Sequence, residues 1–479
     1  MTNGTSDAVW EKLPPIVEPV FGIDERPESW WETLLYGWQH TLVDISPFVL
    51  PLAVAAAIGM SPDDEASLIN FGLFSMGVAT LIQTTIGNRL PIIQGPSATL
   101  TGTLAPVASQ LGPGAMWGAA FAGGLAEMAF GATRALTLLR RFFPPAVAGV
   151  VVLTIALALG QVAVRLMVGD GQALNFVLAA AVLALVALLQ LRLKNVWGGI
   201  LSRGAIFVSI WVVGIGLAGL LGKVDWALVG AKEWIAWPDL FPWGGPGFGW
   251  SFVGAAFLAV VAGYFGSMVE SLGDYAATCA VAGERYTVRH MNRGIFAEGL
   301  GSALATVLGG LPCTSYTQNV GIIATTRVAS RTVVRVAALI LALYGLSPKF
   351  GALLVAMPRP VLGGVFVLVC GMIAVSGIRL LGAAKQTTTN YLVSGLTLVL
   401  AIGLPTYVRY GLGEPWLQEL PLLLRLVLTN PVVLAVLAAV GLNALTSLAA
   451  TPDVEPAGGG EEETGQADSR TDAEGPSED

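Results

Sequence analysis

Charge is scarce in this sequence. Asp, Glu, Lys and Arg make up 12% of its 479 residues, about half the share of an ordinary soluble domain. Hydrophobic residues reach 54%, and the mean hydropathy is +0.71. A soluble fold of this length would need far more surface charge. The composition therefore argues against soluble enzymes and nucleic-acid-binding proteins and predicts a polytopic membrane protein.

Cysteine and histidine are also rare. The chain has only Cys279, Cys313 and Cys370, all in apolar surroundings and without CxxC spacing. We therefore expect neither a disulfide framework nor a metal site.

The hydrophobic runs predict fourteen membrane spans, because a helix needs about 20 residues to cross a bilayer. The predicted spans are 33–58, 66–87, 91–109, 115–139, 144–168, 172–190, 200–221, 252–280, 293–311, 313–329, 332–348, 350–376, 390–408 and 418–448. The third and tenth are short and polar in the middle, so they can cross only as broken helices. Fourteen spans place both termini on one side.

The loops between the predicted spans differ in charge. Most Lys and Arg residues fall in loops on the side of the termini, which predicts that both termini are cytoplasmic. Residues 451–479 hold ten acidic residues against one basic residue and no aromatic residue. This tail cannot bury a core, and we expect it to be disordered.

Two proline-glycine segments read alike, Phe143–Val151 and Met357–Val365. They open the fifth and twelfth predicted spans, seven spans apart. An odd number of spans reverses the orientation in the membrane, so the pattern predicts an inverted repeat. The expected fold class is an all-α polytopic membrane protein with 14 transmembrane segments in two inverted 7-span repeats.

The two broken spans also stand seven spans apart. Leu90–Thr99 and Leu311–Gly321 each begin with a proline after one apolar residue, continue through polar residues and become a short helix. Short extended strands are therefore expected to break spans 3 and 10, and Pro96 is expected in the first turn of the second half-helix. Such backbone persists at membrane depth only where protein covers it or it lines a cavity. A matched pair of broken spans points to the substrate site of a transporter.

Acidic residues occur within the eighth predicted span. Glu270 and Asp274 are four residues apart and share one helix face. Each carboxylate near mid-membrane costs about 3 kcal/mol on insertion scales. They either bind substrate, carry a proton or both, or they make a structural polar contact between helices.

A histidine occurs in the first predicted span. His40 is best explained as a core histidine that bonds across helices, and a role in coupling is the alternative. Asp44, one turn further on, is a candidate partner for it.

These residues resemble the nucleobase–ascorbate transporter family, also called nucleobase:cation symporter family two. Gln318–Arg327 matches the family signature of Gln, Glu or Pro followed by Asn-x-Gly, four free positions and Thr. Three further motifs agree, namely Asn292–Ser302, Gln39-His40 and Glu270-x-x-Gly273-Asp274. The resemblance covers about Trp31 to Asn443.

The resemblance implies a fold similar to that of the uracil permeases. Spans 1–4 and 8–11 would form a core domain that moves against a gate domain of spans 5–7 and 12–14, as in an elevator. The expected divisions are 1–32 cytoplasmic N-terminal segment, 33–139 core, 140–250 gate, 251–348 core, 349–450 gate and 451–479 cytoplasmic tail. It further implies a homodimer and symport of a nucleobase with H⁺ or, less often, Na⁺.

The resemblance also implies residue roles. Glu270 would bind the N–H edge of the base, Gln318 would be the second clamp, and Asn319 would shape the site. Family members that recognise uracil tend to have glutamate at the position of Gln318, whereas glutamine resembles the xanthine and uric acid carriers. Ala98 stands where many relatives have an aromatic residue, so either stacking comes from Tyr316 or Phe265 or the substrate differs. The predicted substrate-binding residues are Glu270, Gln318, Asn319, Ala98, Ser97, Phe265 and Tyr316, and the predicted coupling residues are Asp274, Glu270 and His40.

The sequence thus predicts a secondary active transporter of the plasma membrane that imports a nucleobase, most of all xanthine or uric acid. Its expected partners are the base, the lipid bilayer and a second copy, with no nucleic acid. No cofactor is expected beyond the coupling ion, H⁺ or Na⁺. The alternatives are a uracil permease of the same family and an anion transporter of the sulfate-permease type. An embedded enzyme is disfavoured, because the sequence has no HExxH motif, no protease-type aspartate pair and no nucleophile elbow.

Overall fold

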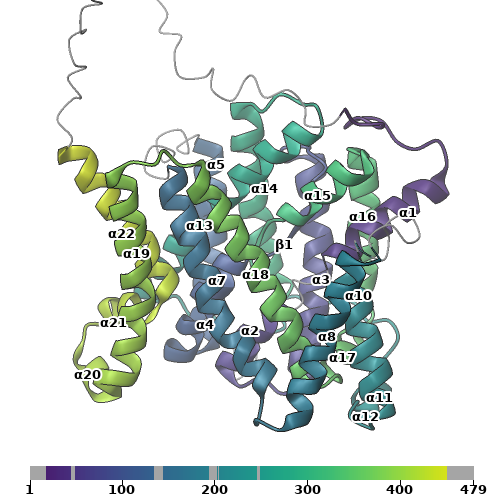
Figure 1. The fold of residues 1–479 in the computed structure, drawn as a ribbon, viewed down its shortest axis with the longest axis horizontal. Helices are drawn as coiled ribbons and strands as arrows, with labels where there is room; N and C mark the ends of the chain where they lie inside the picture. Colours follow the sequence, from purple (N-terminus) through teal and green to yellow (C-terminus); the bar gives the residue numbers. More distant parts are fainter. Residues whose placement is uncertain are drawn as a thin grey trace, which may run out of the picture.

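The computed structural model describes residues 18–44, 49–133, 144–193, 202, 204–244 and 249–449. These residues form a bundle of helices that run mostly between two opposite faces (Figure 1). Residues 1–17 of the predicted N-terminal segment and the whole predicted tail, 451–479, lie outside the described residues.

The first half of the chain begins with a helical series interrupted by one short strand. Its elements are α1 (Trp30–Val43), α2 (Val49–Ile58), α3 (Pro62–Thr85), β1 (Gln94–Pro96), α4 (Ala98–Leu111) and α5 (Pro113–Thr133). The elements that follow are α7 (Pro145–Val168), α8 (Ala173–Leu191), α10 (Ala205–Ser209), the π-helix η4 (Ile210–Leu217), α11 (Ala218–Leu220) and α12 (Trp226–Ala231).

The second half follows a similar order, with a strand again preceding a short helix. Its elements are α13 (Gly254–Val281), α14 (Val288–Val307), β2 (Cys313–Ser315), α15 (Thr317–Thr326), α16 (Arg331–Gly345), α17 (Pro348–Val355) and α18 (Arg359–Ala383). The chain ends in α19 (Thr388–Tyr407), the π-helix η5 (Val408–Leu412), α20 (Gly413–Glu419), α21 (Leu422–Thr429) and α22 (Pro431–Ala449).

The structure corrects several predicted spans. The first, 33–58, begins at Trp30 and consists of α1 and α2, while residues 45–48 between them lie outside the described residues. The predicted span 332–348 extends to Val355 and bends by 75° between α16 and α17. The predicted span 418–448 is not one helix, because α21 and α22 meet at 93°.

Prolines account for both sharp bends. Pro348 opens α17 and Pro431 opens α22. A proline has no N–H to donate and disfavours helical backbone at the residue before it, so each preceding helix ends there. Within the described ranges, six helices are long and apolar enough to cross a membrane, or up to eight if each bent pair counts as one span. The count of fourteen stays a prediction.

The two strands lie in the two segments that were expected to break. β1 and β2 pair antiparallel, with Gln94 opposite Ser315 and Pro96 opposite Cys313. β1 is near the middle of the bundle in Figure 1. Helix α4 begins at Ala98 with Ser97 as its N-cap. The placement of Pro96 in a first helical turn was therefore wrong, because its carbonyl and its extended backbone belong to the strand pair.

The two helices that open with the similar segments pack against each other. α7 and α18 run antiparallel, since Gly149 near the start of α7 faces Gly377 near the end of α18. A Cβ atom added at Gly149 would lie 2.8 Å from the backbone N of Leu381. Glycine at this position therefore permits the close approach of two helix backbones.

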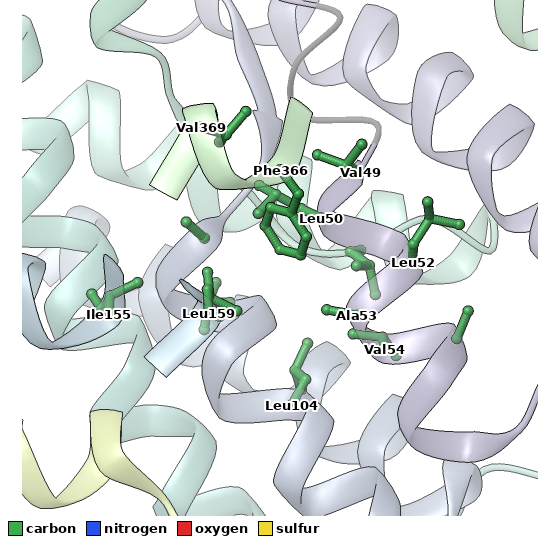
Figure 2. Packing of buried hydrophobic residues seen from close by; sticks show 14 of the residues in the cluster. Val49, Leu50, Leu52, Ala53, Val54, Leu104, Ile155, Leu159, Phe366 and Val369 are labelled. Atoms are coloured by element: carbon green, nitrogen blue, oxygen red, sulfur yellow. The ribbon is translucent and has the colours of Figure 1, made fainter. Parts of the chain in front are cut away.

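An apolar core joins these helices to the strand region. Figure 2 shows Val49 and Leu50 of α2 beside Phe366 of α18, with Leu104 of α4 and Leu159 of α7 nearby. All five side chains are almost fully buried. This contact consists of van der Waals packing between segments of the predicted core and gate domains.

Candidate substrate site

The two half-helices start where the paired strands end. The backbone N–H of Ser97 donates to the Pro312 carbonyl at 2.9 Å, and that of Tyr316 donates to the Ile93 carbonyl at 3.1 Å. The Ser97 hydroxyl accepts from the N–H of Leu100 and thereby caps α4. The strand pair thus fixes the N-termini of α4 and α15, whose free N–H groups carry partial positive charge.

Helix α13 connects to both half-helices through two acidic side chains. The Glu270 carboxylate accepts a hydrogen bond from the Thr99 hydroxyl of α4 at 3.2 Å. Asp274 accepts from Ser315 at 3.0 Å and from Thr317 at 2.6 Å, so it faces β2 and α15. Asp274 is buried, whereas Glu270 is half-buried. One face of α13 therefore places both predicted acids between the broken segments.

Ser97 and Gln318 lie on opposite half-helices. The Ser97 hydroxyl is 3.3 Å from that of Ser267 on α13. Gln318 occupies the first turn of α15 and is half-buried. Within the described chain its amide makes no hydrogen bond, so its donor and its acceptor are both free to bind a ligand.

Asn319 connects α15 to α1. Its Nδ2 donates to Asp44 at 2.6 Å, and its Oδ1 lies 2.7 Å from Nδ1 of His40. Since that oxygen can only accept, the Nδ1 of His40 is the donor. All three side chains are buried. His40 thus bonds across helices, as expected of a core histidine, and Asn319 separates it from Asp44, the partner that the sequence had suggested.

The two candidate aromatic rings make contacts inside the protein. The Tyr316 hydroxyl donates to the Pro96 carbonyl at 3.0 Å. Phe265 packs against Phe130 of α5, with ring centroids 5.3 Å apart. Ala98 is the first residue of α4 and is buried. Stacking of a ligand on either ring stays a prediction.

The sequence reasoning missed three hydroxyl residues of this site. Thr99, Ser315 and Thr317 hold Glu270 and Asp274 in place. All three closely follow the prolines of the broken spans in the sequence, and this position could have identified them as candidates. Their contacts depend on the strand pairing and could not be assigned without it.

The segment before α1 contacts the residues that follow the C-terminus of α15. Phe21 pairs with Val328, the Ala329 N–H donates to the Phe21 carbonyl at 2.8 Å, and Asp24 forms an ion pair with Arg331. The half-helix that carries Gln318 is therefore held at both ends.

The two broken segments thus pair at their strands, with acidic side chains between their half-helices. The profile of the permease family matches residues 31–410. The chain belongs to this family, the nucleobase–ascorbate transporters, and is a multi-pass membrane permease rather than an enzyme.

Two curated relatives align over most of the chain. The uric acid permease PucK of Bacillus subtilis (strain 168) is 32% identical over 387 residues, which cover 78% of this chain and 87% of PucK. The xanthine permease XanQ of Escherichia coli (strain K12) is 30% identical over 455 residues, which cover 88% of this chain and 93% of XanQ.

A solved structure has a similar fold. The transmembrane domain of the cyanobacterial bicarbonate transporter BicA matches with a TM-score of 0.57 at 16% identity. The match covers 87% of this chain and 99% of that domain. At this identity the likeness shows the fold alone.

Proposed function

We propose that this permease imports a nucleobase, xanthine or uric acid, by symport with a proton. The relatives PucK and XanQ are named for uric acid and xanthine. The proposal rests above all on two groups of the site. The half-buried carboxylate of Glu270 bonds to Thr99 of one half-helix, and the unbonded amide of Gln318 belongs to the other half-helix. A carboxylate accepts from N–H groups, and an amide both donates and accepts. The edge of a purine alternates donors and acceptors in the same way.

Proton coupling is supported by the arrangement on α13. Glu270 and Asp274 are one helical turn apart, and within the described chain neither forms an ion pair. Two carboxylates this close in a protein interior do not both ionise readily. One proton shared by the pair would travel with the base, and bound base N–H groups would favour the ionised form of Glu270.

An elevator movement is supported by the contact between the predicted domains. Apolar side chains of α2 and α4 meet those of α7 and α18 (Figure 2). Such a surface has few directional bonds to break when the segments slide. The charge asymmetry of the loops supports the proposal that both termini are cytoplasmic. We further propose a homodimer in the plasma membrane, on the resemblance to the family.

Uptake of radiolabelled xanthine and urate into proteoliposomes tests this function. Competition by xanthine, urate, uracil, adenine, ascorbate and sulfate identifies the substrate. We expect that xanthine or urate blocks the uptake of the labelled base and that the other competitors do not. Block by uracil alone would favour the uracil permease, and block by sulfate alone would favour the anion transporter, against which the two site carboxyl groups argue.

A further inference from the structure

A second pair of acidic side chains lies apart from Glu270 and Asp274. Glu127 of α5 and Glu298 of α14 are each 1% exposed. Their helices cross in close contact, because a Cβ atom added at Gly299 would lie 2.7 Å from the Gly124 carbonyl oxygen. Glu127 lies one turn beyond Gly124 on α5, and Glu298 directly precedes Gly299 on α14, so the crossing brings the two glutamates close together.

Glu298 has well-formed hydrogen bonds. Its Oε1 accepts from the Ser271 hydroxyl at 2.8 Å, and its Oε2 accepts from the Tyr275 hydroxyl at 2.6 Å. Gln83 of α3 in turn donates to the Tyr275 oxygen at 2.8 Å. Glu298 is thus held rigidly as an acceptor.

Glu127 has no such donors. Among the described residues, nothing donates to either of its carboxyl oxygens, although both are fully buried. The helix crossing at Gly124 and Gly299 brings the carboxyl of Glu298 close to it. Two carboxyl groups hydrogen-bond only if one of them holds a proton. A proton shared with Glu298 would therefore give Glu127 the partner that it lacks among the described residues.

A third buried group points at the same pair. The Gln94 amide of β1 is 0% exposed and faces Glu298. Neither of its polar atoms reaches hydrogen-bond geometry with any described residue. A buried amide without a partner is costly, which marks this spot as one where the hydrogen-bond pattern can change.

Among the described residues, the groups around the pair are acids and weak acids, and none of them is a cation. Tyr264 and Tyr275 of α13 and Cys313 of β2 face it, and Asp274 and Glu270 lie further along α13. In the described part of the chain, neither glutamate has a salt bridge. An uncompensated buried charge is costly, so a shared proton is the means of stabilisation left to the pair.

Hydroxyl groups connect this pair to the candidate substrate site. The Ser271 hydroxyl donates to Glu298, and its oxygen lies 2.9 Å from the Ser315 oxygen. The Ser315 hydroxyl in turn lies 3.0 Å from the Asp274 carboxyl. The route from Asp274 to Glu298 thus runs through two side-chain hydroxyls. Each can pass a proton by accepting one and donating its own.

We propose that Glu127 and Glu298 form a second proton-binding site, connected through Ser271 and Ser315 to Asp274. The glutamate pair shares one proton before the base binds. A proton that leaves the substrate site when the base binds would move to the pair as a second proton, so that both carboxyls are neutral, and would stay with the protein while the base crosses. It would return by the same route and leave with the base on the other side. No proton is created or lost, and no other ion is needed. This inference rests on proton symport as the proposed function.

Transport by Glu127→Gln tests the coupling. The amide can donate to Glu298 without a shared proton, so the fold and the binding of the base should be kept. With an imposed gradient of about one pH unit, one coupled proton supports about tenfold accumulation. The variant should lose this accumulation while base exchange at equal pH continues. The exposed Glu233→Gln is the matched control and should behave as the wild type.

Two transport results would overturn the proposal. One is wild-type accumulation by Glu127→Gln. The other is loss of base binding in a variant that still elutes as a folded protein, because Glu127 would then act on the substrate site itself.

Infrared difference spectra test the proton directly and do not require transport. In wild-type protein we expect a carboxylic acid C=O band that shifts in D₂O and that both Glu127→Gln and Glu298→Gln remove. If neither variant removes such a band from the wild-type spectrum, the glutamate pair is not a proton-binding site. If the wild-type protein transports no nucleobase, the proposed function is wrong. The infrared result still decides whether Glu127 and Glu298 hold a proton.

Discussion

The Thr99 hydroxyl of α4 donates to the Glu270 carboxylate of α13 at 3.2 Å, although the two residues are 171 positions apart in the chain. This bond orients one carboxyl oxygen and leaves the other for a ligand. The two residues come from the two halves of the chain, so the site depends on both halves being packed together.

Replacing Glu270 by glutamine should abolish uptake and leave the protein folded. The change keeps the shape and removes the anionic acceptor, and a hydrogen bond to a charged group contributes about 1.5–3 kcal/mol, or about 10- to 100-fold in affinity. Binding and uptake of xanthine and urate measure the loss, with Glu233→Gln as the control. Uptake at the wild-type rate would show that the site lies elsewhere.

Replacing Gln318 by glutamate should shift preference from xanthine or urate toward uracil. An amide that donates and accepts becomes a group that only accepts when ionised, so the ligand must present a different edge. Competition profiles of wild type and variant measure this shift. Gln386→Glu, at an exposed position, is the control. Identical profiles in wild type and Gln318→Glu would mean that Gln318 does not touch the base.

Replacing Asp274 by asparagine should keep base binding and remove accumulation against a gradient. In the wild type, uptake should fall as external pH rises, because fewer transporters then hold the shared proton. A protonophore should collapse accumulation for the same reason. Sodium dependence without any pH response in reconstituted vesicles would contradict proton coupling and would make the same carboxylates cation ligands.

Replacing Asn319 by leucine should destabilise the protein. His40 and Asp44 would both lose their hydrogen-bond partner in a buried place, at about 1–3 kcal/mol for each unsatisfied group. Thermal unfolding in detergent, compared with Asn390→Leu at a half-buried position, measures the effect. Equal unfolding temperatures for the two variants would mean that the α1–α15 contact is not needed for stability.

Deleting the residues after Pro452 should leave uptake intact. The removed segment is acidic, lacks aromatic residues and cannot form a core. Uptake by wild type and truncation at matched membrane levels provides the comparison. Loss of uptake with normal insertion would reveal a regulatory contact of the tail.

Much could be predicted from local patterns. The lack of charge predicted a membrane protein, and the motif Gln318–Arg327 with its three companions predicted the family to which the chain belongs. The prolines at the broken spans marked the strands at Gln94–Pro96 and Cys313–Ser315. These features depend on residues close together in the chain or on composition.

Other features required the packed structure. The bends before Pro348 and Pro431 were missed, because apolar runs on both sides of a proline look like one span. Three features join distant segments: the hydroxyl partners of Glu270 and Asp274, the position of Asn319 between His40 and Asp44, and the helix crossing that brings Glu127 close to Glu298. Composition and spacing determined that the chain crosses a membrane and that its third and tenth predicted spans are broken. Only the pairing of the two strands, and the close helix crossings that glycine permits, decided which polar side chains meet, because a buried polar group is defined by neighbours that the linear sequence does not place.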